Sequence, residues 1–209
     1  MSYQIESETS SEELTEIEEA NLFTVIRNRR ATRSYLGKPV SDKIIETLID
    51  FSIQAPSAMN LQPWSFVVIQ NQKILKEISD SVKKNLFSNP DFSKEVSKRG
   101  LHFFNETDAD LFYGATTLIV ICAKNSSDKQ FSTEADCFLA AQNFMLAATG
   151  MGLATCPIGL VRNYIAQPEI SKKLGVLENY TPVLPIVIGY AGTQQHEVAR
   201  NPAIIKWIR

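Results

Sequence analysis

The chain contains few of the residues that most often carry catalysis or bind metals. It has 209 residues, with only two histidines and three cysteines. The cysteines, Cys122, Cys137 and Cys156, form no C-x-x-C pair, so the sequence indicates neither a zinc site nor dithiol chemistry. Each lies among apolar residues, and we expect three small buried thiols. His102 has no evident acidic partner and does not by itself indicate a catalytic site.

The sequence also lacks a long hydrophobic run and an excess of basic residues. Its longest apolar runs, Leu118–Ala123 and Val183–Ile188, are too short to cross a bilayer. The N-terminus is acidic and has no hydrophobic segment, so it does not read as a signal peptide. The formal net charge of −2 argues against a general binder of nucleic acid or anionic membranes. We therefore expect a cytoplasmic protein with neither kind of partner.

The overall composition is that of a globular protein. Hydrophobic residues make up 44% of the chain and charged residues 21%, close to globular averages. Residues 1–20 are rich in Glu and Ser, which predicts a disordered or loosely helical lead. Residues 21–209 are long enough to bury a large core, so we expect them to form one domain.

Hydrophobic periodicity predicts alternating helices and strands. We expect helices at Leu22–Arg29, Asp42–Ile53, Gln72–Leu86 and Thr133–Thr149, and strands at Ser65–Gln70, Leu118–Ala123 and Val183–Ile188. In the first helix, Leu22, Val25 and Ile26 would form one buried stripe. The second helix would begin after Ser41 as its N-cap and bury its apolar face through Ile53. The strand at 65–70 is nearly continuously apolar, as expected for a strand covered on both sides.

Two further segments carry more apolar residues than one chain would bury. The helix at 133–149 is hydrophobic nearly all round, which predicts burial on most sides and favours contact with a partner subunit. Residues 204–208, Ile-Ile-Lys-Trp-Ile, are apolar for a free tail, so we expect them to dock, for example across a partner. Residues 87–110 show weak periodicity and clustered aromatics.

Three arginines within five residues form a candidate anion site. Arg29, Arg30 and Arg33 follow the first helix, and a guanidinium group is a planar fork of donors that suits phosphate oxygens. Arg29 and Arg33 are four apart, so on a helix end they would share one face, with Arg30 turned away. The alternative is a solvated basic helix end, favoured only by the helix dipole.

A second candidate segment is the turn that follows the helix at 42–53. It reads Ala-Pro-Ser-Ala-Met-Asn-Leu-Gln-Pro-Trp over residues 55–64 and is rich in turn-forming and small residues. Asn60 both donates and accepts hydrogen bonds, which suits the edge of a heteroaromatic ring. The alternative is an ordinary connection between a helix and a strand.

In this order and at this separation, the two segments resemble the FMN-dependent nitroreductase family. The chain has RRATR followed by APSAMNLQPW, where the family has RRSxR followed by APSxxNxQPW. The resemblance continues through LFYGA at 111–115, GLATCPIG at 152–159 and ARNP at 199–202, and covers nearly all of the chain from about residue 21. It implies an α+β fold: a three-layer sandwich with a mixed, mainly antiparallel central sheet flanked by helices, in an intertwined homodimer.

The resemblance also implies which residues bind FMN. Arg29, Arg33 and Arg200 would neutralise the phosphate, with Arg30 reaching the phosphate or the ring edge. The backbone of residues 56–60, from the second subunit, would meet the ring and ribityl chain, and a loop at 157–160 would place a backbone N–H near flavin N5. The full set of implied FMN-binding residues is Arg29, Arg30, Ala31, Arg33, Pro56, Ser57, Ala58, Met59, Asn60, Pro157, Ile158, Gly159, Leu160 and Arg200.

The reaction implied by the resemblance is a ping-pong hydride transfer through FMN. NADPH or NADH would be the donor, and a nitroaromatic, a quinone or a related small molecule the acceptor, with no catalytic side chain and no metal. Within the family, residues 87–110 would cover the flavin; the alternative is a surface excursion. Ala31 stands where many members have Ser, and Ala58 stands where members often have a hydroxyl residue. Gly159 stands where some members have Glu. The affinity for FMN could therefore be lower than usual in the family. The alternative functions are another flavin reaction, such as reductive dehalogenation, and a non-catalytic phosphate- or nucleotide-binding module.

Overall fold

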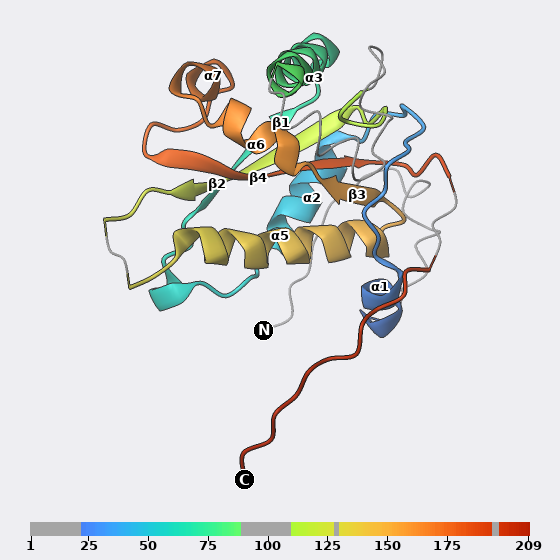
Figure 1. The fold of residues 1–209 in the computed structure, drawn as a ribbon, viewed down its shortest axis with the longest axis vertical. Helices are drawn as coiled ribbons and strands as arrows, with labels where there is room; N and C mark the ends of the chain where they lie inside the picture. Colours follow the sequence, from blue (N-terminus) through green and yellow to red (C-terminus); the bar gives the residue numbers. More distant parts are fainter. Residues whose placement is uncertain (1–21, 89–109, 128–129, 194–196) are drawn as a thin grey trace, which may run out of the picture.

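The computed structural model describes residues 22–88, 110–127, 130–193 and 197–209 (Figure 1). The predictions for the acidic lead at residues 1–20, for His102 and for a cover formed by residues 87–110 lie almost wholly outside the described residues. In the described part of the chain, no helix is both long enough and apolar enough to cross a membrane.

A four-stranded antiparallel sheet forms the middle layer. Its strands are β1 (Trp64–Ile69), β2 (Thr117–Lys124), β3 (Ala154–Pro157) and β4 (Tyr180–Gly189), arranged in the order β1-β2-β4-β3. Every pair of named strands is antiparallel. The parallel element of the expected mixed sheet is a single bridge between Ala31 and Thr155.

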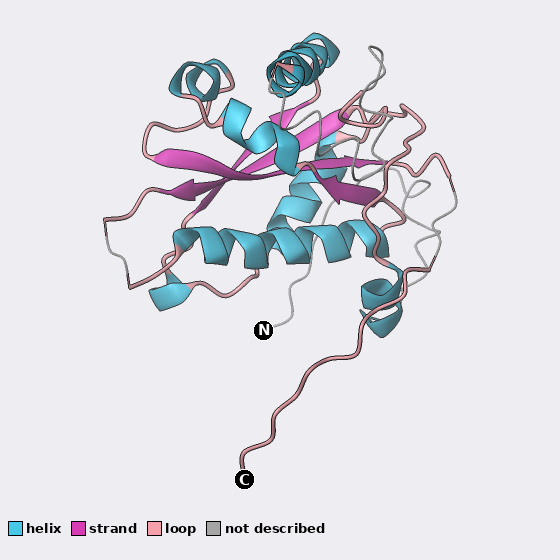
Figure 2. Cartoon of the chain, in the orientation of Figure 1, coloured by secondary structure: helices cyan, strands magenta, loops and turns pink. Residues whose placement is uncertain are grey.

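Helices cover both faces of this sheet (Figures 1 and 2). Helices α2 (Asp42–Ser52) and α5 (Thr133–Gly150) lie on one face, and α3 (Gln72–Phe87), α6 (Gly159–Ile165) and α7 (Pro168–Lys173) lie on the other. Helix α1 (Leu22–Asn28) packs beside the C-terminal end of α5, where its Val25 Cγ2 lies 3.7 Å from the position of a Cβ built on Gly150. The three-layer α+β fold implied by the resemblance is confirmed.

The central strand β2 supplies side chains to two separate hydrophobic cores. Leu118, Val120 and Cys122 belong to the core beneath α3 and α6. The alternate residues Ile119 and Ile121 belong to the core beneath α2 and α5. This alternation follows from the pleat of a strand, and burial on both faces explains the unbroken apolar run.

The edge strand β1 is less buried than predicted. It pairs only with β2, and Val68 is 41% exposed, so the expectation of cover on both sides was wrong. Helix α2 was also one residue shorter than expected: Ile53 is its C-cap and 36% exposed, not part of the buried face. Ser41 is the N-cap of α2, but its side chain makes no capping hydrogen bond.

Several apolar side chains remain exposed on the single chain. The buried residues of α5 lie on one side of the helix, while Phe138 and Leu139 are 40% and 48% exposed, so α5 is not buried on most sides by its own chain. On α1 only Val25 is buried, not the expected three-residue stripe. The C-terminal segment 197–209 extends away from the body, and its apolar side chains are exposed (Figure 1). The tail therefore does not dock on its own chain, and docking on a partner stays a prediction.

Candidate functional site

The arginine-rich segment leaves α1 and is fixed against the start of β3. The Arg29 N–H donates to the Val25 carbonyl at 2.9 Å, which closes the helix. Ala31 forms its bridge with Thr155, and the Thr32 N–H donates to the Thr155 carbonyl at 3.0 Å. The spacing of Arg29 and Arg33 predicted that they share one face of a helix, and this prediction was wrong. The two residues lie on either side of the bridge that Ala31 forms with Thr155.

The Arg30 side chain binds carbonyl oxygens at the C-terminal end of α1. Its guanidinium donates to the carbonyl oxygens of Arg27 and, at 2.9 Å, Arg29. A cation at the C-terminal end of a helix is favoured by the helix dipole. For Arg30, the structure thus supports the alternative of a capping cation.

Arg29 and Arg200 converge from opposite ends of the chain. Arg29 is half-buried, and the pKa of its guanidinium is lowered by burial first, then by the charges of Arg200 and Arg30. Burial is the larger cause, and Arg200 lies near enough for its charge to contribute. The two arginines that the resemblance assigned to one phosphate are therefore within range of each other's charge.

Arg33 lies near enough to Cys156 and Tyr113 for its charge to affect the pKa of both side chains. Burial raises the pKa of the Cys156 thiol, and the charges of Arg33 and Arg29 oppose that rise. Burial also raises the pKa of the Tyr113 phenol, and the charge of Arg33 opposes that rise. Sequence reasoning did not single out Tyr113, because its residue type and spacing carried no signal beyond membership of the LFYGA segment. All three cysteines are free and buried, as predicted.

Residues 157–160 form a junction between a strand and a helix, not the expected loop. Pro157 ends β3, and the Ile158 N–H donates to the Pro185 carbonyl at 2.8 Å. Gly159 and Leu160 begin α6, so their N–H groups have no acceptor within the helix. Because Ala31 pairs with Thr155, β3 connects this junction to the arginine segment.

The turn at residues 56–60 has a constrained backbone. Met59 and Asn60 form part of the short helix η1 (Ala58–Asn60) and have φ of 51° and 53°, and Gln62 has φ of 46°. The Ser57 hydroxyl accepts the Gln62 N–H at 2.9 Å, and the Asn60 side-chain oxygen accepts from Gln62 Nε2 at 3.0 Å. Left-handed conformations are uncommon for residues other than glycine, so this turn is held by its own hydrogen bonds against local strain.

The turn and the arginines lie at opposite ends of α5. The Ala58 N–H donates to the Asp136 carboxylate, at 3.3 Å from Oδ2, in the first turn of α5. Arg29 follows α1, which packs against Gly150 at the last residue of α5. Gly150 lies fourteen positions after Asp136 along the helix, a rise of about 21 Å. One chain therefore holds apart the two groups of residues that the resemblance implies for FMN, the turn at residues 56–60 and the arginine segment, as two implied half-sites.

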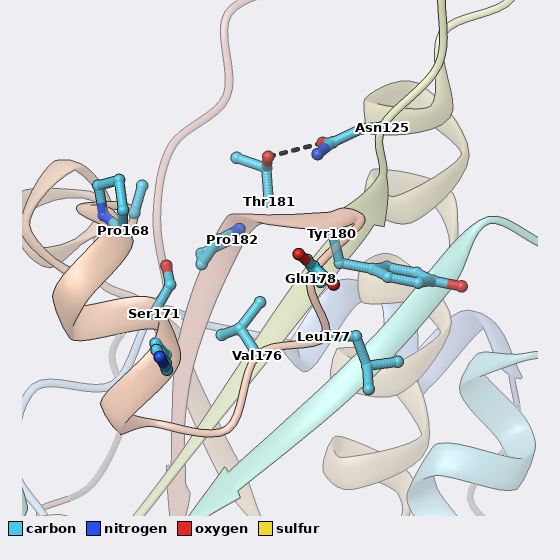
Figure 3. A pocket seen from close by; sticks show the side chains of 11 residues that line it. Asn125, Pro168, Ser171, Val176, Leu177, Glu178, Tyr180, Thr181 and Pro182 are labelled. Atoms are coloured by element: carbon cyan, nitrogen blue, oxygen red, sulfur yellow. Dashed lines mark hydrogen bonds between the residues drawn. The ribbon is translucent and has the colours of Figure 1, made fainter.

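The cavity drawn in Figure 3 is separate from both half-sites. Its volume is about 600 Å³, and its lining residues, which include Asn125, Ser171 and Tyr180, come from α7, from the residue after β2, and from the start of β4 with the loop that precedes it. The Thr181 hydroxyl donates to Asn125 Oδ1 at 2.7 Å beside it. Thr155, which anchors the arginine segment, pairs with Ile188 near the other end of β4. No residue of the cavity belongs to the implied FMN set. In the described ranges, no group of three His, Cys, Asp or Glu side chains could hold a metal ion.

The family model described as "Nitroreductase; Nitroreductase family" matches residues 26–190. This chain belongs to the nitroreductase family. The resemblance drawn from the arginine segment and the turn is thereby confirmed, and with it the prediction that the chain is a flavin-dependent oxidoreductase.

Individual relatives and solved structures agree with that assignment. A nitroreductase from Desulfitobacterium hafniense, solved with bound FMN, has a TM-score of 0.76 and 26% identity, over 90% of this chain and 98% of that one. A protein of Archaeoglobus fulgidus, provisionally named NADH dehydrogenase/NAD(P)H nitroreductase, is 27% identical over 79% of this chain and 83% of its own length. A 4-nitrobenzoate reductase from Nocardioides sp. is 25% identical over 85% of this chain and 83% of its own length. The expected cofactor FMN and donor NAD(P)H agree with what these proteins bind or are named for.

Proposed function

We propose that this protein is an FMN-dependent NAD(P)H oxidoreductase that works as a homodimer and reduces nitroaromatic or quinone acceptors. One observation carries the proposal most strongly: Arg200, far from Arg29 in the sequence, lies near enough for its charge to lower the pKa of Arg29, whose segment pairs with β3 through Ala31. The other supports are the separation of the two half-sites and the names of the relatives.

The residues of the arginine half-site fit a phosphate group. The pKa of Arg29 is lowered by burial and by Arg200 and Arg30, and no carboxylate of the described residues contributes to that shift. Like charges held together without a counter-ion are unfavourable, and an anion between them removes the repulsion. Arginine forks also match phosphate oxygens geometrically. Arg29 and Arg200 would hold the phosphate, while Arg30 keeps its role at the end of α1.

The other implied residues would surround the ring by backbone groups. When bound, FMN supplies the redox chemistry, accepting a hydride from NAD(P)H at N5 and delivering it to the acceptor. The N–H groups of Gly159 and Leu160 would serve as donors to the ring, a role that needs no particular side chain. The Asn60 side-chain NH₂, whose paired oxygen is occupied by Gln62, would donate to the ring edge.

A second copy of the chain would complete the site. In one chain the turn at 56–60 and Arg29 are separated by most of the length of α5, so one flavin cannot contact both. A twofold axis across α5 would bring the turn of each copy to the arginines of the other. The exposed Phe138 and Leu139 on α5, and Leu22 and Phe23 on α1, supply apolar surface for such an interface.

The acceptor class is proposed from the relatives and not from a pocket. The 4-nitrobenzoate reductase is named for a nitroaromatic substrate, and the Archaeoglobus protein for both NADH dehydrogenase and nitroreductase activity. Flat aromatic acceptors suit a site whose walls are a ring face and backbone groups. A cytoplasmic location and a single domain over residues 21–209 remain part of the proposal.

The experiment that tests the proposal begins with flavin loading. Purified protein is incubated with FMN, desalted, and reduced anaerobically with NADPH or NADH while its absorbance is followed. We expect retained yellow colour that bleaches with one or both nucleotides and returns when 4-nitrobenzoate or a benzoquinone is added. Colourless protein after incubation with FMN would support a phosphate- or nucleotide-binding module without redox activity. Loaded protein that bleaches but is reoxidised only by haloaromatic compounds would favour dehalogenation.

A further inference from the structure

Residues 34–36 run antiparallel to the segment that follows β4. Tyr35 and Ala191 form a bridge at the centre of this pairing. Beside the bridge, the Gly192 N–H donates to the Ser34 carbonyl at 2.8 Å. The chain that leaves the sheet after β4 therefore lies directly against the chain that follows the arginine segment.

The backbone is fixed on both sides of Arg33. Immediately before it, the Thr32 N–H donates to the Thr155 carbonyl at 3.0 Å, and Thr32 is 1% exposed. Immediately after it, the Ser34 carbonyl accepts the Gly192 N–H. Arg33 itself is exposed. Its side chain therefore extends from a backbone that β3 and the segment after β4 hold in place.

Two glycines make room for residues 34 and 35. A Cβ built on Gly189, the last residue of β4, would lie 3.0 Å from Cδ1 of the Tyr35 ring. A Cβ built on Gly192 would lie 2.6 Å from Ser34 Oγ and 3.2 Å from the carbonyl carbons of Ser34 and Tyr35. Non-bonded carbon atoms prefer separations of about 3.5–4.0 Å, and although the hydroxyl can rotate away, the carbonyl carbons move only with the backbone. Neither glycine has a positive φ, so these positions require glycine for space and not for backbone conformation.

We propose that Gly189 and Gly192 are positioning residues for the cofactor. Because they have no side chains, residues 34 and 35 lie close against the end of β4. The Arg33 backbone is thereby held where its guanidinium reaches the phosphate of FMN. This role rests on the proposed function, in which the arginine segment binds that phosphate, and on the assignment of Arg33 to the phosphate by the resemblance. Neither glycine needs to touch the flavin, and their effect requires both the guanidinium and the phosphate.

Binding of riboflavin, which is FMN without its phosphate, separates this role from a general loss of structure. Dissociation constants of both flavins are measured by flavin fluorescence for the wild type and for the glycine variants. We expect Gly192→Ala to weaken FMN binding by roughly three- to tenfold and Gly192→Val to weaken it further, since each displaces a charge-assisted contact to the phosphate. Gly189→Ala should act in the same direction. Riboflavin binding should change by less than about twofold in all three variants, because riboflavin has no phosphate for Arg33 to contact.

A double-mutant cycle tests whether the effect passes through Arg33. Arg33→Ala should weaken FMN binding at least as much as Gly192→Ala, and the double variant should bind FMN no more weakly than Arg33→Ala alone. Tyr35→Phe is the matched control. It keeps the ring against Gly189 and removes a buried hydroxyl that has no hydrogen-bond partner among the described residues, so both dissociation constants should stay at their wild-type values.

The possible outcomes separate this inference from the proposed function. The inference is overturned if the Gly192 variants leave FMN binding unchanged, if they weaken riboflavin binding equally, or if their effect persists in full without Arg33. It is also overturned if the wild type binds riboflavin as tightly as FMN, even where NAD(P)H reduces the bound flavin as proposed. Wild-type protein that binds neither flavin would overturn the proposed function and the inference with it. Melting temperatures of the apo proteins accompany each measurement, and Gly192→Ala decides the question where Gly192→Val does not fold.

Discussion

The Asp136 carboxylate accepts the backbone N–H of Ala58, with its two oxygens at 3.3 and 3.4 Å. Asp136 is 7% exposed and lies in the first turn of α5, where the helix dipole favours a negative charge. This contact joins the strained turn at residues 56–60 to α5, the longest helix among the described residues. The turn is thus fixed by a residue that does not belong to the implied FMN set.

We expect Asp136→Ala to lower the free energy of unfolding by about 0.5–1.5 kcal/mol and to reduce FMN retention, because the turn loses its anchor. Asp136→Asn keeps an oxygen acceptor and should restore most of both properties. Urea unfolding and flavin content after desalting measure the two effects. Equal losses in the alanine and asparagine variants would contradict the anchoring role.

The second prediction concerns the two converging arginines. Arg29→Ala and Arg200→Ala should each weaken FMN binding by roughly 1.5–3 kcal/mol, because each removes a charge-assisted contact to the phosphate. Arg200→Ala should leave the stability of the apo protein unchanged or slightly higher, since it removes a like charge that lowers the pKa of Arg29. Arg27→Ala, on the exposed surface of α1, controls for net charge. Unchanged flavin content in both site variants would count against the phosphate assignment.

The layered fold could be predicted from the sequence because periodicity and apolar runs report burial directly. The strand at 118–123, for example, is apolar throughout because β2 is covered by α3 on one face and α5 on the other. The expectations that failed depend on where an element lies in the fold, which the hydrophobic pattern of its residues does not report. Val68 looks like a core residue but lies on an edge strand, and α6 was missed because its seven residues show too little periodicity.

For the candidate site, too, some features could be predicted from the sequence and others could not. The convergence of Arg29 and Arg200 was expected only from the resemblance, since no local rule links residues so far apart. The spacing argument for Arg29 and Arg33 on a helix failed, because the chain leaves α1 at Asn28 to form a bridge with β3. Asp136 was missed because it acts through a contact with the Ala58 N–H that only the fold creates.

The third prediction concerns the buried thiols. Burial raises the pKa of Cys122 and Cys137 to about 12 and also raises that of Cys156. The unfolded thiols ionise at lower pH than the folded ones, so their stabilising contribution is complete below about pH 8.5 and is lost as pH rises toward 12. The free energy of unfolding should therefore fall above pH 8.5, by at most about 1.4 kcal/mol per pH unit for each thiol. Urea unfolding at pH 8, 9.5 and 10.5 measures it, and Cys137→Ala should flatten the slope.

The fourth prediction compares two buried hydroxyl groups. Thr155 Oγ1 is buried and has no hydrogen-bond partner among the described residues, whereas the Ser52 hydroxyl donates to the Ala140 carbonyl at 2.8 Å. Thr155→Val keeps the shape and removes an unsatisfied group, so it should be neutral or stabilising, while Ser52→Ala should cost about 0.5–1.5 kcal/mol. Thermal and urea unfolding of the apo protein test both. A Thr155→Val variant that loses as much stability as Ser52→Ala would reveal a partner outside the described residues.

The last prediction concerns assembly. If α1, α5 and the tail bind a second copy, the protein should sediment as a dimer at submicromolar concentration. Deletion of residues 204–209 should raise the dimer dissociation constant at least tenfold, since burying even one large apolar side chain contributes about 1.5–3 kcal/mol.

Leu139→Glu, in the exposed face of α5, should disrupt the dimer and release FMN together, because the turn of one copy would no longer reach the arginines of the other. Leu177→Glu, at another exposed leucine that lines the cavity of Figure 3, should change neither property. A monomer that retains FMN with wild-type affinity would contradict a site shared between two copies.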